Sequence, residues 1–413
     1  MKNINNEISI CIIDYSGSTD FFLRIAAADS NRKYIFISPI LSVYFKSRKY
    51  KNVQVIIVHK WTLFFKKNKL NESFDYSKTR EEYLDLLNNT NKIKYHNILL
   101  DVCYNIVNEN ISSNINFLLW NGESIAGLVA RHISSKNKKI KTLFFEISNL
   151  PNKLFVNSLG VNASSSLYAS ESSDFKNLSC EYDLEKYNEW KNNFINYKLK
   201  NNSNIPPQAP KGKKIQFYFF YDFLFSFFSF RMYSLDSIHR RLSFLKPKVK
   251  KNKNSIIFNN TIPNIDFLFL PLQVSNDSQL KINSDVNNIQ ALEIAIKRGY
   301  KLILCKPHPA EHDISYLIDW LKKNDTHNNI LLSNADTYQL INSCQELLVI
   351  NSTVGFEAMI FGKSVEFLGR TLYNKLDSKT LPYFILNYLI NIDFFSNDKI
   401  ENKEIEKIYS YRK

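Results

Sequence analysis

Three short polar segments in the second half of the 413-residue chain carry side chains that could do chemistry. They are QVSNDSQ at residues 273–279, KPHPAE at residues 306–311 and NSTVGFE at residues 351–357. In the third segment, Ser352 or Thr353 can cap a helix, whose free N–H groups and positive dipole end favour a phosphate or a carboxylate. This pattern indicates a site for an anionic ligand.

Each of these segments has a simpler explanation when it is taken alone. Asn-Ser-Thr before a helix is most often only a cap, Lys-Pro-His-Pro can be a rigid turn, and a lone Asp in a polar loop is usually a turn former. All three segments, however, directly follow predicted strands, and packing does not require all three to be polar. Their combination therefore favours a ligand site at the carboxyl ends of the strands.

Two strand ends in the first half of the chain offer a second set of polar residues. Glu146 closes a predicted strand that begins at residue 141, and Asn121 follows the predicted strand 117–120. A carboxylate that faces a second domain can act as a general acid or base, because a closed cleft raises its pKa. A helix cap or a salt-bridge partner is the simpler interpretation of Glu146. No G-x-G-x-x-G or G-x-x-x-x-G-K-[ST] motif is present.

The elements that position these residues alternate between strands and helices along the chain. In the first half, apolar runs predict strands, and periodic segments between them predict helices. The predicted strands are 8–14, 34–37, 53–58, 117–120 and 141–146, and the predicted helices are 21–27, 79–87 and 124–133. This alternation predicts an α/β domain with a largely parallel sheet.

The second half repeats the alternation as four strand–helix units and a final strand. The predicted strands are 267–272, 301–305, 329–332, 346–350 and 365–368, and the predicted helices are 287–298, 314–323, 337–343 and 354–361. We therefore predict an N-terminal Rossmann-like domain at 1–166 and a C-terminal Rossmann-like domain with terminal helices at 263–413. Residues 167–262 are predicted to form an inter-domain region.

The charge of the chain is concentrated in one part of that inter-domain region. The net charge is +15, and residues 211–253 contribute +9 of it, from eleven Lys or Arg and two Asp. This segment includes the aromatic run 215–230, which contains Asp222 and is shorter than the roughly 20 residues that span a bilayer. Basic and aromatic residues together are typical of an anchor at an anionic membrane surface. A core-packed hairpin or helix pair with solvated basic ends is the alternative, and nucleic-acid binding ranks lowest because no such module is present.

Length and cysteine usage exclude several classes of protein. A chain of this size can bury its own cores, which excludes a disulfide-stapled miniprotein and a disordered tail. The five cysteines are scattered singly, which predicts buried thiols in a reducing compartment and no structural zinc. The N-terminus lacks the features of a secretion signal. We expect a cytoplasmic protein, peripheral at the inner face of the inner membrane.

The polar segments together resemble bacterial capsule polysaccharide biosynthesis proteins. More narrowly, they are similar to the retaining β-Kdo glycosyltransferases of capsule and lipopolysaccharide assembly. FFEISNLP at residues 144–151 and LGVNASS at residues 159–165 add to the resemblance, which runs from about residue 117 to residue 369. It implies a GT-B-like α/β fold with two Rossmann-like domains facing a central cleft, CMP-β-Kdo as donor, a glycan or lipid-linked glycan as acceptor, and no metal or other cofactor.

The resemblance also implies roles for individual residues. Asp277 matches the nucleophile of a double displacement, His308 a histidine beside the leaving phosphate, and Glu146 a glutamate that acts on the acceptor hydroxyl. Lys306 and the helix end near Ser352 would neutralise that phosphate. The predicted donor or nucleotide-binding residues are Gln273, Ser275, Asn276, Lys306, Ser352, Thr353, Gly355 and Glu357. The predicted acceptor-side residues are Asn121, Asn162 and Ser164.

The sequence departs from the family pattern on the acceptor side. Ile147 and Ser148 follow Glu146 where many capsule relatives have Asn-Gly, and Asn157 stands where they have Asp. Two alternatives to a Kdo transferase therefore stay open. One is a sialyltransferase or another nucleotide-sugar transferase of the same fold, and the other is a non-catalytic factor of polysaccharide assembly or export.

Overall fold

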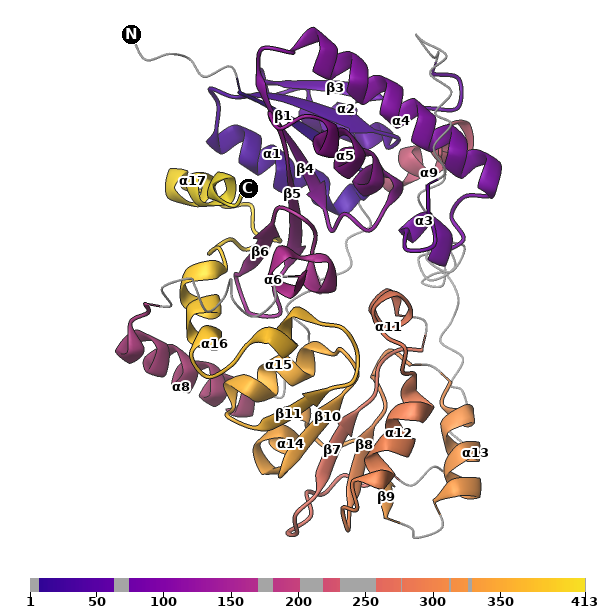
Figure 1. The fold of residues 1–413 in the computed structure, drawn as a ribbon, viewed down its shortest axis with the longest axis vertical. Helices are drawn as coiled ribbons and strands as arrows, with labels where there is room; N and C mark the ends of the chain where they lie inside the picture. Colours follow the sequence, from indigo (N-terminus) through magenta and orange to yellow (C-terminus); the bar gives the residue numbers. More distant parts are fainter. Residues whose placement is uncertain are drawn as a thin grey trace. The chain divides into compact units, whose positions relative to one another are not determined.

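Two separate sheets, each mainly parallel, organise the chain (Figure 1). The computed structural model describes residues 7–62, 74–169, 181–200, 218–230, 258–275, 277–311, 313–325 and 329–412. The chain divides into two compact units. Unit 1 comprises Met1–Ser166, Pro206–Lys248 and Leu389–Lys413, and unit 2 comprises Leu167–Ile205 and Val249–Tyr388. The predicted inter-domain region is therefore shared between the two units.

The sheet of unit 1 has six strands in the order β3-β2-β1-β4-β5-β6. The strands are β1 (Glu7–Ile12), β2 (Lys33–Ser38), β3 (Val53–Ile57), β4 (Asn114–Trp120), β5 (Ile140–Ile147) and β6 (Leu154–Asn157). All neighbours pair in parallel except β5 and β6, which are antiparallel. The central strands are almost entirely buried, as expected for a parallel sheet that helices cover on both faces.

Two helices of unit 1 begin at residues whose side chains cap free backbone N–H groups. Asn88 caps α4 and Ser124 caps α5 in this way. The helices are α1 (Thr19–Ala28), α2 (Leu41–Ser47), α3 (Arg80–Tyr83), α4 (Asn89–Glu109), α5 (Ile125–Lys136), α9 (Tyr218–Phe228) and α17 (Asn402–Ser410), while α6 (Ser166–Ala169) begins at its edge. The predicted helix 79–87 is shorter in the structure, because Asp85 takes a left-handed conformation with φ of 47°. The long helix α4 was not predicted.

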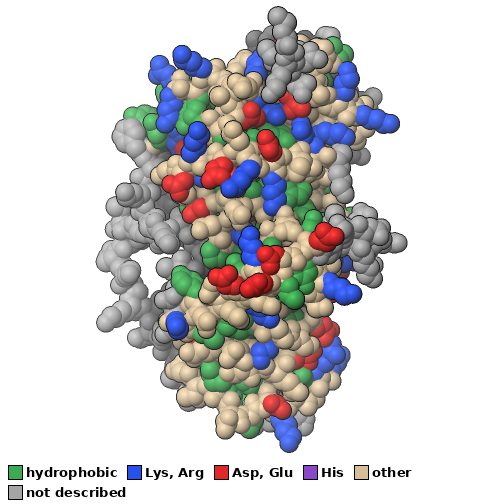
Figure 2. All heavy atoms as spheres, turned by 90° about the vertical axis from the view of Figure 1, so that its left-hand side faces the viewer, with side chains coloured by type: hydrophobic (Ala, Val, Ile, Leu, Met, Phe, Trp, Pro, Cys, Tyr) green, Lys and Arg blue, Asp and Glu red, His purple; other side chains and the backbone are tan. Residues whose placement is uncertain are grey.

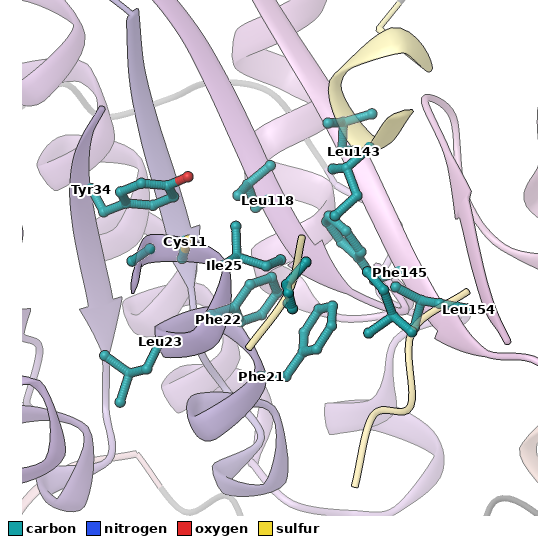
Figure 3. Close-up of a cluster of buried hydrophobic side chains, with 14 of the residues drawn as sticks. Cys11, Phe21, Phe22, Leu23, Ile25, Tyr34, Leu118, Leu143, Phe145 and Leu154 are labelled. Carbon is teal, nitrogen blue, oxygen red and sulfur yellow. The ribbon is translucent and has the colours of Figure 1, made fainter. Parts of the chain in front are cut away.

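Aromatic side chains from α1 and β5 form the centre of the core of unit 1 (Figure 3). The ring of Phe145 lies 5.7 Å from that of Phe21 and 5.6 Å from that of Phe22, both in edge-to-face geometry. Leu118 from the neighbouring strand β4 and Leu143 from β5 complete this layer. The core also includes residues from the C-terminal end of the chain, among them Ile390, Ile392, Ile405 and Ile408.

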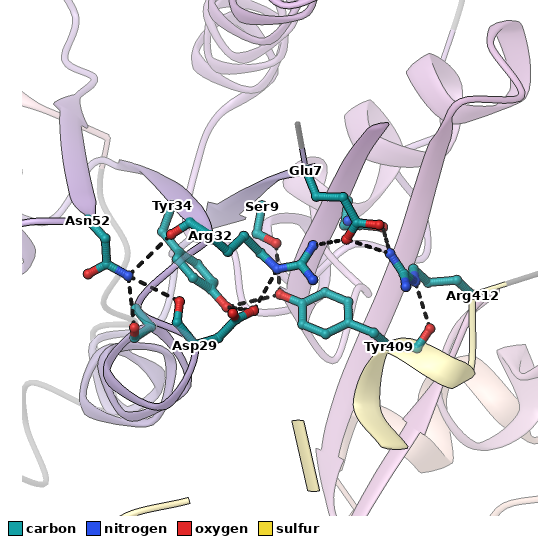
Figure 4. Close-up of polar contacts among 10 residues, drawn as sticks. Glu7, Ser9, Asp29, Arg32, Tyr34, Asn52, Tyr409 and Arg412 are labelled. Carbon is teal, nitrogen blue, oxygen red and sulfur yellow. Dashed lines mark hydrogen bonds and ion pairs between the residues drawn. The ribbon is translucent and has the colours of Figure 1, made fainter. Parts of the chain in front are cut away.

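A polar network holds the C-terminal helix α17 against the sheet of unit 1 (Figure 4). The hydroxyl of Tyr409 lies 2.8 Å from that of Ser9 and 3.1 Å from that of Tyr34. The guanidinium of Arg32 stacks over the Tyr409 ring at 3.9 Å. The sequence predicts residues 389–413 as part of the C-terminal domain, whereas these contacts group them with unit 1.

The sheet of unit 2 has five parallel strands in the order β11-β10-β7-β8-β9. The strands are β7 (Leu268–Pro271), β8 (Ile303–Lys306), β9 (Ile330–Leu332), β10 (Glu346–Val349) and β11 (Ser364–Phe367). The helices are α8 (Leu184–Lys200), α11 (Ser278–Asn283), α12 (Asn288–Lys297), α13 (Ser315–Asn324), α14 (Thr337–Ser343), α15 (Thr353–Ile360) and α16 (Thr380–Tyr383). Every strand and helix predicted between 267 and 368 is present within two residues of its predicted ends.

The predicted α/β class with two Rossmann-like domains is confirmed by these sheets. In each unit the first strand lies between the second and the fourth, so the order reverses between β1 and β4 and between β7 and β10. Ligands of open α/β sheets bind beyond the carboxyl ends of the strands at such switch points. The loops after β7 and β10 are therefore the first place to look for a ligand site in unit 2.

The surface drawn in Figure 2 carries basic and acidic side chains interspersed, without a large area of one sign. Across the stretches that the structure describes, no helix combines the length and apolar character needed to cross a bilayer. Cys11, Cys103, Cys305 and Cys344 are buried free thiols, as predicted, and Cys180 lies outside the described residues.

Candidate functional site

Gln273 connects the two loops at the switch point of unit 2. Its side-chain oxygen accepts a hydrogen bond from the backbone N–H of Asn351, which follows β10, at 3.1 Å. Its backbone is held by Asn288 at the start of α12, through bonds of 3.2 and 2.8 Å. Gln273 is buried, so it fixes the distance between the loops after β7 and β10. Its predicted contact with the donor stays a prediction.

Ser275 is held by residues from the loop after β8 and from α13. Its backbone N–H donates to the Glu311 carboxylate at 2.7 Å, and its hydroxyl lies 3.2 Å from that of Tyr316. The Tyr316 hydroxyl also accepts from the Asn288 side chain at 3.1 Å. The loops after β7 and β8 are therefore tied together at the carboxyl edge of the sheet. Asn276 lies outside the described residues.

His308 and Asp277 are close enough to influence each other electrostatically. Partial removal from water lowers the pKa of His308, and the negative charges of Asp277 and Glu311 oppose this effect. His308 Nδ1 accepts a hydrogen bond from the N–H of Ala310 at 3.1 Å, so the proton of the neutral ring sits on Nε2. Asp277 directly precedes α11 and is half-buried. The two predicted catalytic residues of unit 2 thus share one edge of its sheet.

The loop after β10 forms the capped start of helix α15. Ser352 is the cap, and its hydroxyl accepts from the N–H of Val354 at 3.2 Å. Thr353 is the first residue of the helix and, like Ser352, is half-buried. A helix end of this kind favours an anion because the positive end of the helix dipole lies there. The predicted cap is confirmed, and the bound phosphate stays a prediction.

Two residues predicted to bind the donor instead face the interior of unit 2. A Cβ atom on Gly355 would lie 2.6 Å from the Phe367 ring and 2.7 Å from a methyl group of Val349, so glycine lets α15 pack closely on β10 and β11. Glu357 is 4% exposed and accepts from the Lys198 ammonium and the Tyr338 hydroxyl, both at 3.0 Å. Both residues pack and pair inside the unit, which accounts for them without a ligand.

Lys306 also has partners inside unit 2. Its ammonium donates to the carbonyl of Ala335 at 2.6 Å and to the hydroxyl of Thr337 at 2.8 Å, both at the start of α14. Burial lowers the pKa of Lys306, and the charge of Asp336 opposes this effect. Two of its three N–H groups thus serve to join β8 to α14, which leaves a smaller role for it in neutralising a phosphate than the sequence suggests.

On the acceptor side, Asn121 and Glu146 lie at the ends of adjacent strands of unit 1. The side-chain amide of Asn121 reaches the Glu146 carboxylate at 3.5 Å. Asn121 has a left-handed backbone with φ of 62°, which asparagine tolerates better than most residues. The structure therefore brings together the predicted general base and one predicted acceptor-side residue.

Asn162 and Ser164 form a short helical turn after β6. Asn162 is buried and also has a left-handed backbone, with φ of 46°, whereas Ser164 is exposed. Asn157, at the end of β6, holds this loop through its side chain, which accepts from the N–H groups of Leu159 and Ser166 at 3.0 Å each. Asparagine thus serves at position 157, where many relatives have aspartate, as an acceptor for the loop.

Arg131 is a further residue of this region that was not predicted from the sequence. Its guanidinium donates to the carbonyls of Gly122 at 2.9 Å and Leu159 at 3.0 Å, and it stacks over the Phe144 ring at 4.3 Å. It therefore joins the loops that carry Asn121 and Asn162. Burial lowers the pKa of Arg131 to about 10. Asn288, Tyr316 and Lys198 were missed in the same way, because their partners are distant in the sequence.

The fold and these loops define a two-unit α/β protein of the Rossmann type with polar strand ends that suit an anionic ligand. Among the described residues, no group of three or more His, Cys, Asp or Glu side chains is arranged to hold a metal ion.

Comparisons with known proteins place the second half of the chain more narrowly. Residues 228–376 match the family described as capsule polysaccharide biosynthesis protein, which confirms the predicted resemblance. Protein FixF of Sinorhizobium fredii is 30% identical over 118 residues, which are 27% of this chain and 28% of that protein. The match thus spans little more than a quarter of this curated relative.

Two solved structures of Thermosulfurimonas dismutans KpsC are similar over much of the chain. The β-Kdo 2,7 transferase covers 97% of this chain and 98% of its own, with 15% identity and a TM-score of 0.46. The β-Kdo 2,4 transferase covers 72% and 87%, with 12% identity and a TM-score of 0.41. The family match is thus to capsule polysaccharide biosynthesis proteins, over residues 228–376 of this chain.

Proposed function

We propose that the protein is a retaining glycosyltransferase that transfers Kdo from CMP-β-Kdo to a surface polysaccharide acceptor of capsule or lipopolysaccharide. The observation that carries the proposal is the grouping of Asp277, His308 and Glu311 at the carboxyl edge of the unit 2 sheet. The family match covers this group and also the capped start of α15. The motif resemblance supplies the identity of the donor.

In the first step, the Asp277 carboxylate attacks the anomeric carbon of Kdo. The bond from that carbon to the phosphate oxygen of CMP breaks, and its electron pair leaves with CMP. His308 carries its proton on Nε2 and is suited to donate a hydrogen bond to the departing phosphate. The α15 N-terminus favours the same negative charge through its dipole. The product of this step is a Kdo ester of Asp277.

In the second step, an acceptor hydroxyl replaces Asp277 on the anomeric carbon. A base takes the hydroxyl proton, and the motif resemblance assigns this role to Glu146. The new glycosidic bond forms, and the electron pair of the ester bond returns to Asp277. Two inversions give net retention of configuration. Asn121 would orient Glu146 through its side-chain amide. No metal takes part in this scheme.

The proposal is tested by the intact mass of the protein after mixing with CMP-Kdo in the absence of acceptor. We expect an added mass of one Kdo residue in the wild type and none in Asp277→Asn, which keeps the size of the side chain but is a much weaker nucleophile. Asp319→Asn, an exposed position on α13, is the matched control and should form the adduct.

Nucleotide release from different donors separates the proposed donor from its rivals. We expect the release of CMP from CMP-Kdo, and no release of UDP or GDP from UDP- or GDP-sugars. If CMP is released only from CMP-sialic acid, the donor is CMP-sialic acid and not CMP-Kdo. Adduct formation in Asp277→Asn would overturn the assignment of the nucleophile. If no donor releases its nucleotide and cells with Asp277→Asn still make normal amounts of glycan, a non-catalytic role would be favoured.

A further inference from the structure

Helix α9 in unit 1 directs its charged residue toward the protein and large apolar side chains toward the solvent. Asp222 is buried and accepts from the backbone N–H and the hydroxyl of Ser42 at 2.7 and 2.6 Å. Ser229, just after the helix, is fully buried, and its hydroxyl lies within 3.0 Å of the carbonyls of Pro39 and Val58. Polar contacts therefore fix which side of α9 points outward.

The outward side of α9 is formed by large apolar side chains. Phe220 is 63% exposed, Phe227 is 64% exposed and Phe228 is 54% exposed, and Tyr221 and Leu224 are also exposed. Positions 220, 224, 227 and 228 follow the spacing of one helical face. Large contiguous apolar surfaces of this kind mark contacts with a protein or a membrane. We call the five residues the α9 face.

Trp61 extends the α9 face at its carboxyl end. Its ring is 65% exposed and lies 5.9 Å from the ring of Phe228. Lys60 holds this loop in place, because its ammonium donates to the Phe227 carbonyl at 3.1 Å and its N–H donates to the Phe228 carbonyl at 3.3 Å. A tryptophan with an exposed ring beside a basic residue is typical of side chains at the level of lipid headgroups.

A basic hollow of about 440 Å³ lies at the amino end of α9. Its lining residues are Asp20, Leu23, Phe45, Lys46, Arg48, Lys49, Tyr50 and Tyr218. Tyr218 begins α9 and stacks with Phe45 at 6.4 Å, so the hollow adjoins the α9 face. Lys46 pairs with Asp20 at 2.7 Å, whereas Arg48 and Lys49 are exposed. Residues 41–62 contain five Lys or Arg and no Asp or Glu, so this edge of unit 1 is positively charged.

We propose that the α9 face and the basic hollow together dock unit 1 on a bilayer that contains anionic phospholipid. The aromatic side chains enter the interface, and Arg48 and Lys49 bind the lipid phosphate. With 11 residues, α9 is about 16 Å long, roughly half the thickness of the hydrocarbon core, so it lies along the membrane surface. The local positive charge favours this occupant over a second copy of the chain, which would bring like charges together.

The test is flotation of the full chain with vesicles of phosphatidylcholine alone or mixed with phosphatidylglycerol. We expect binding only to the mixed vesicles, weakened by salt, and about tenfold weaker in Arg48→Glu/Lys49→Glu. Phe220→Ser/Phe227→Ser should lose binding to a similar extent. The matched controls are Lys138→Glu/Lys139→Glu and Ile111→Ser, which change exposed residues elsewhere in unit 1 and should bind like the wild type.

A second readout reports the orientation of the bound protein and the folding of the variants. Lipids brominated near the headgroup should quench part of the tryptophan fluorescence in the wild type, and this quenching should be lost in Trp61→Phe. Unchanged thermal unfolding of each variant shows that it is folded. Equal binding of all variants, or no binding by the wild type, would overturn the proposal. The proposal would also be overturned if the wild type sediments as a dimer, the Phe220→Ser/Phe227→Ser variant sediments as a monomer, and both bind vesicles equally.

Discussion

At the scale of single residues, an unusual buried cluster lies beyond the carboxyl end of β1. Glu81 is fully buried, and one of its oxygens accepts from the N–H of Ile125 at 3.0 Å. Its other oxygen lies 3.9 Å from the guanidinium of Arg80, which also donates to the carbonyl of Asp14 at 2.9 Å. Burial raises the pKa of Glu81 to about 7, Arg80 opposes this effect, and Asp14 adds to it.

This raised pKa predicts that unit 1 loses stability as the pH rises. An unfolded glutamate has a pKa near 4.5, so the folded state holds the proton more tightly. Its contribution is fully present below about pH 4.5 and is lost as the pH rises through about 7. In Glu81→Gln the loss should be absent, because an amide does not ionise and its oxygen can still accept from Ile125.

The measurement is the free energy of unfolding in urea at several values between about pH 5 and 8. As the pH rises over this range, the free energy of unfolding of Glu81→Gln should increase by about 1–3 kcal/mol relative to that of the wild type. Glu109→Gln, an exposed position at the end of α4, is the control and should follow the wild type. A constant difference between Glu81→Gln and the wild type would contradict the prediction.

At the scale of elements, a buried ion pair attaches α8 to the rest of unit 2. Lys198 on α8 donates to Glu357 on α15 at 3.0 Å and to the Tyr338 hydroxyl on α14 at 2.6 Å. Lys198 and Glu357 are both almost fully buried. Removing one partner of such a pair leaves an uncompensated buried charge, which costs much more than the pair contributes.

We therefore expect Lys198→Met to lower the free energy of unfolding of unit 2 by about 3–5 kcal/mol. The double variant Lys198→Met/Glu357→Leu should recover most of this loss, because no unpaired charge stays buried. Lys186→Met, an exposed lysine on the same helix, is the control and should change stability little. If the double variant is less stable than both single variants, the pair itself stabilises the unit and our interpretation is wrong.

The same elements show what the sequence could and could not predict. The strands of unit 2 were predicted because they are buried apolar runs, and Ser352 was predicted as a cap because it directly precedes α15. The role of Glu357 was not predicted, because its partner Lys198 is 159 residues away. Helix α4 was missed because its first two turns are mostly polar. Local patterns therefore predict the elements, whereas pairs between distant residues decide which polar side chains are used inside the unit.

At the scale of the whole molecule, neither unit is one continuous piece of chain. Leu389–Lys413 returns to unit 1 after unit 2 has been completed. Ile390 pairs with Leu154 at the end of the sheet through two backbone hydrogen bonds of 2.9 Å. The guanidinium of Arg412 binds Glu7 of β1 at 3.0 Å, and Arg32 and Arg412 hold the pKa of Glu7 below its usual value although burial opposes this. The end of the chain thus closes the first unit.

This arrangement predicts that deleting residues 389–413 unfolds unit 1. The deletion removes seven buried side chains from its core, Ile390, Ile392, Phe394, Ile400, Ile405, Ile408 and Tyr409. At about 1.5–3 kcal/mol each, their loss rivals the whole stability of a domain, which is about 5–15 kcal/mol.

Two tryptophans allow the outcome to be measured in each unit, with Trp120 in unit 1 and Trp320 in unit 2. The ring of Trp120 lies 4.4 Å from that of Phe394, so the fluorescence of Trp120 in the deletion variant should be that of an exposed ring at all temperatures. The fluorescence of Trp320 should still show a cooperative thermal transition. Loss of this transition in Trp320→Phe would identify Trp320 as its source. Tyr409→Phe is the milder companion, because it removes only the hydroxyl bonds to Ser9 and Tyr34 and should cost about 1 kcal/mol. A deletion variant whose Trp120 melts as in the full chain would show that unit 1 folds without its last segment, and the grouping of the C-terminal residues with that unit would then have no energetic basis.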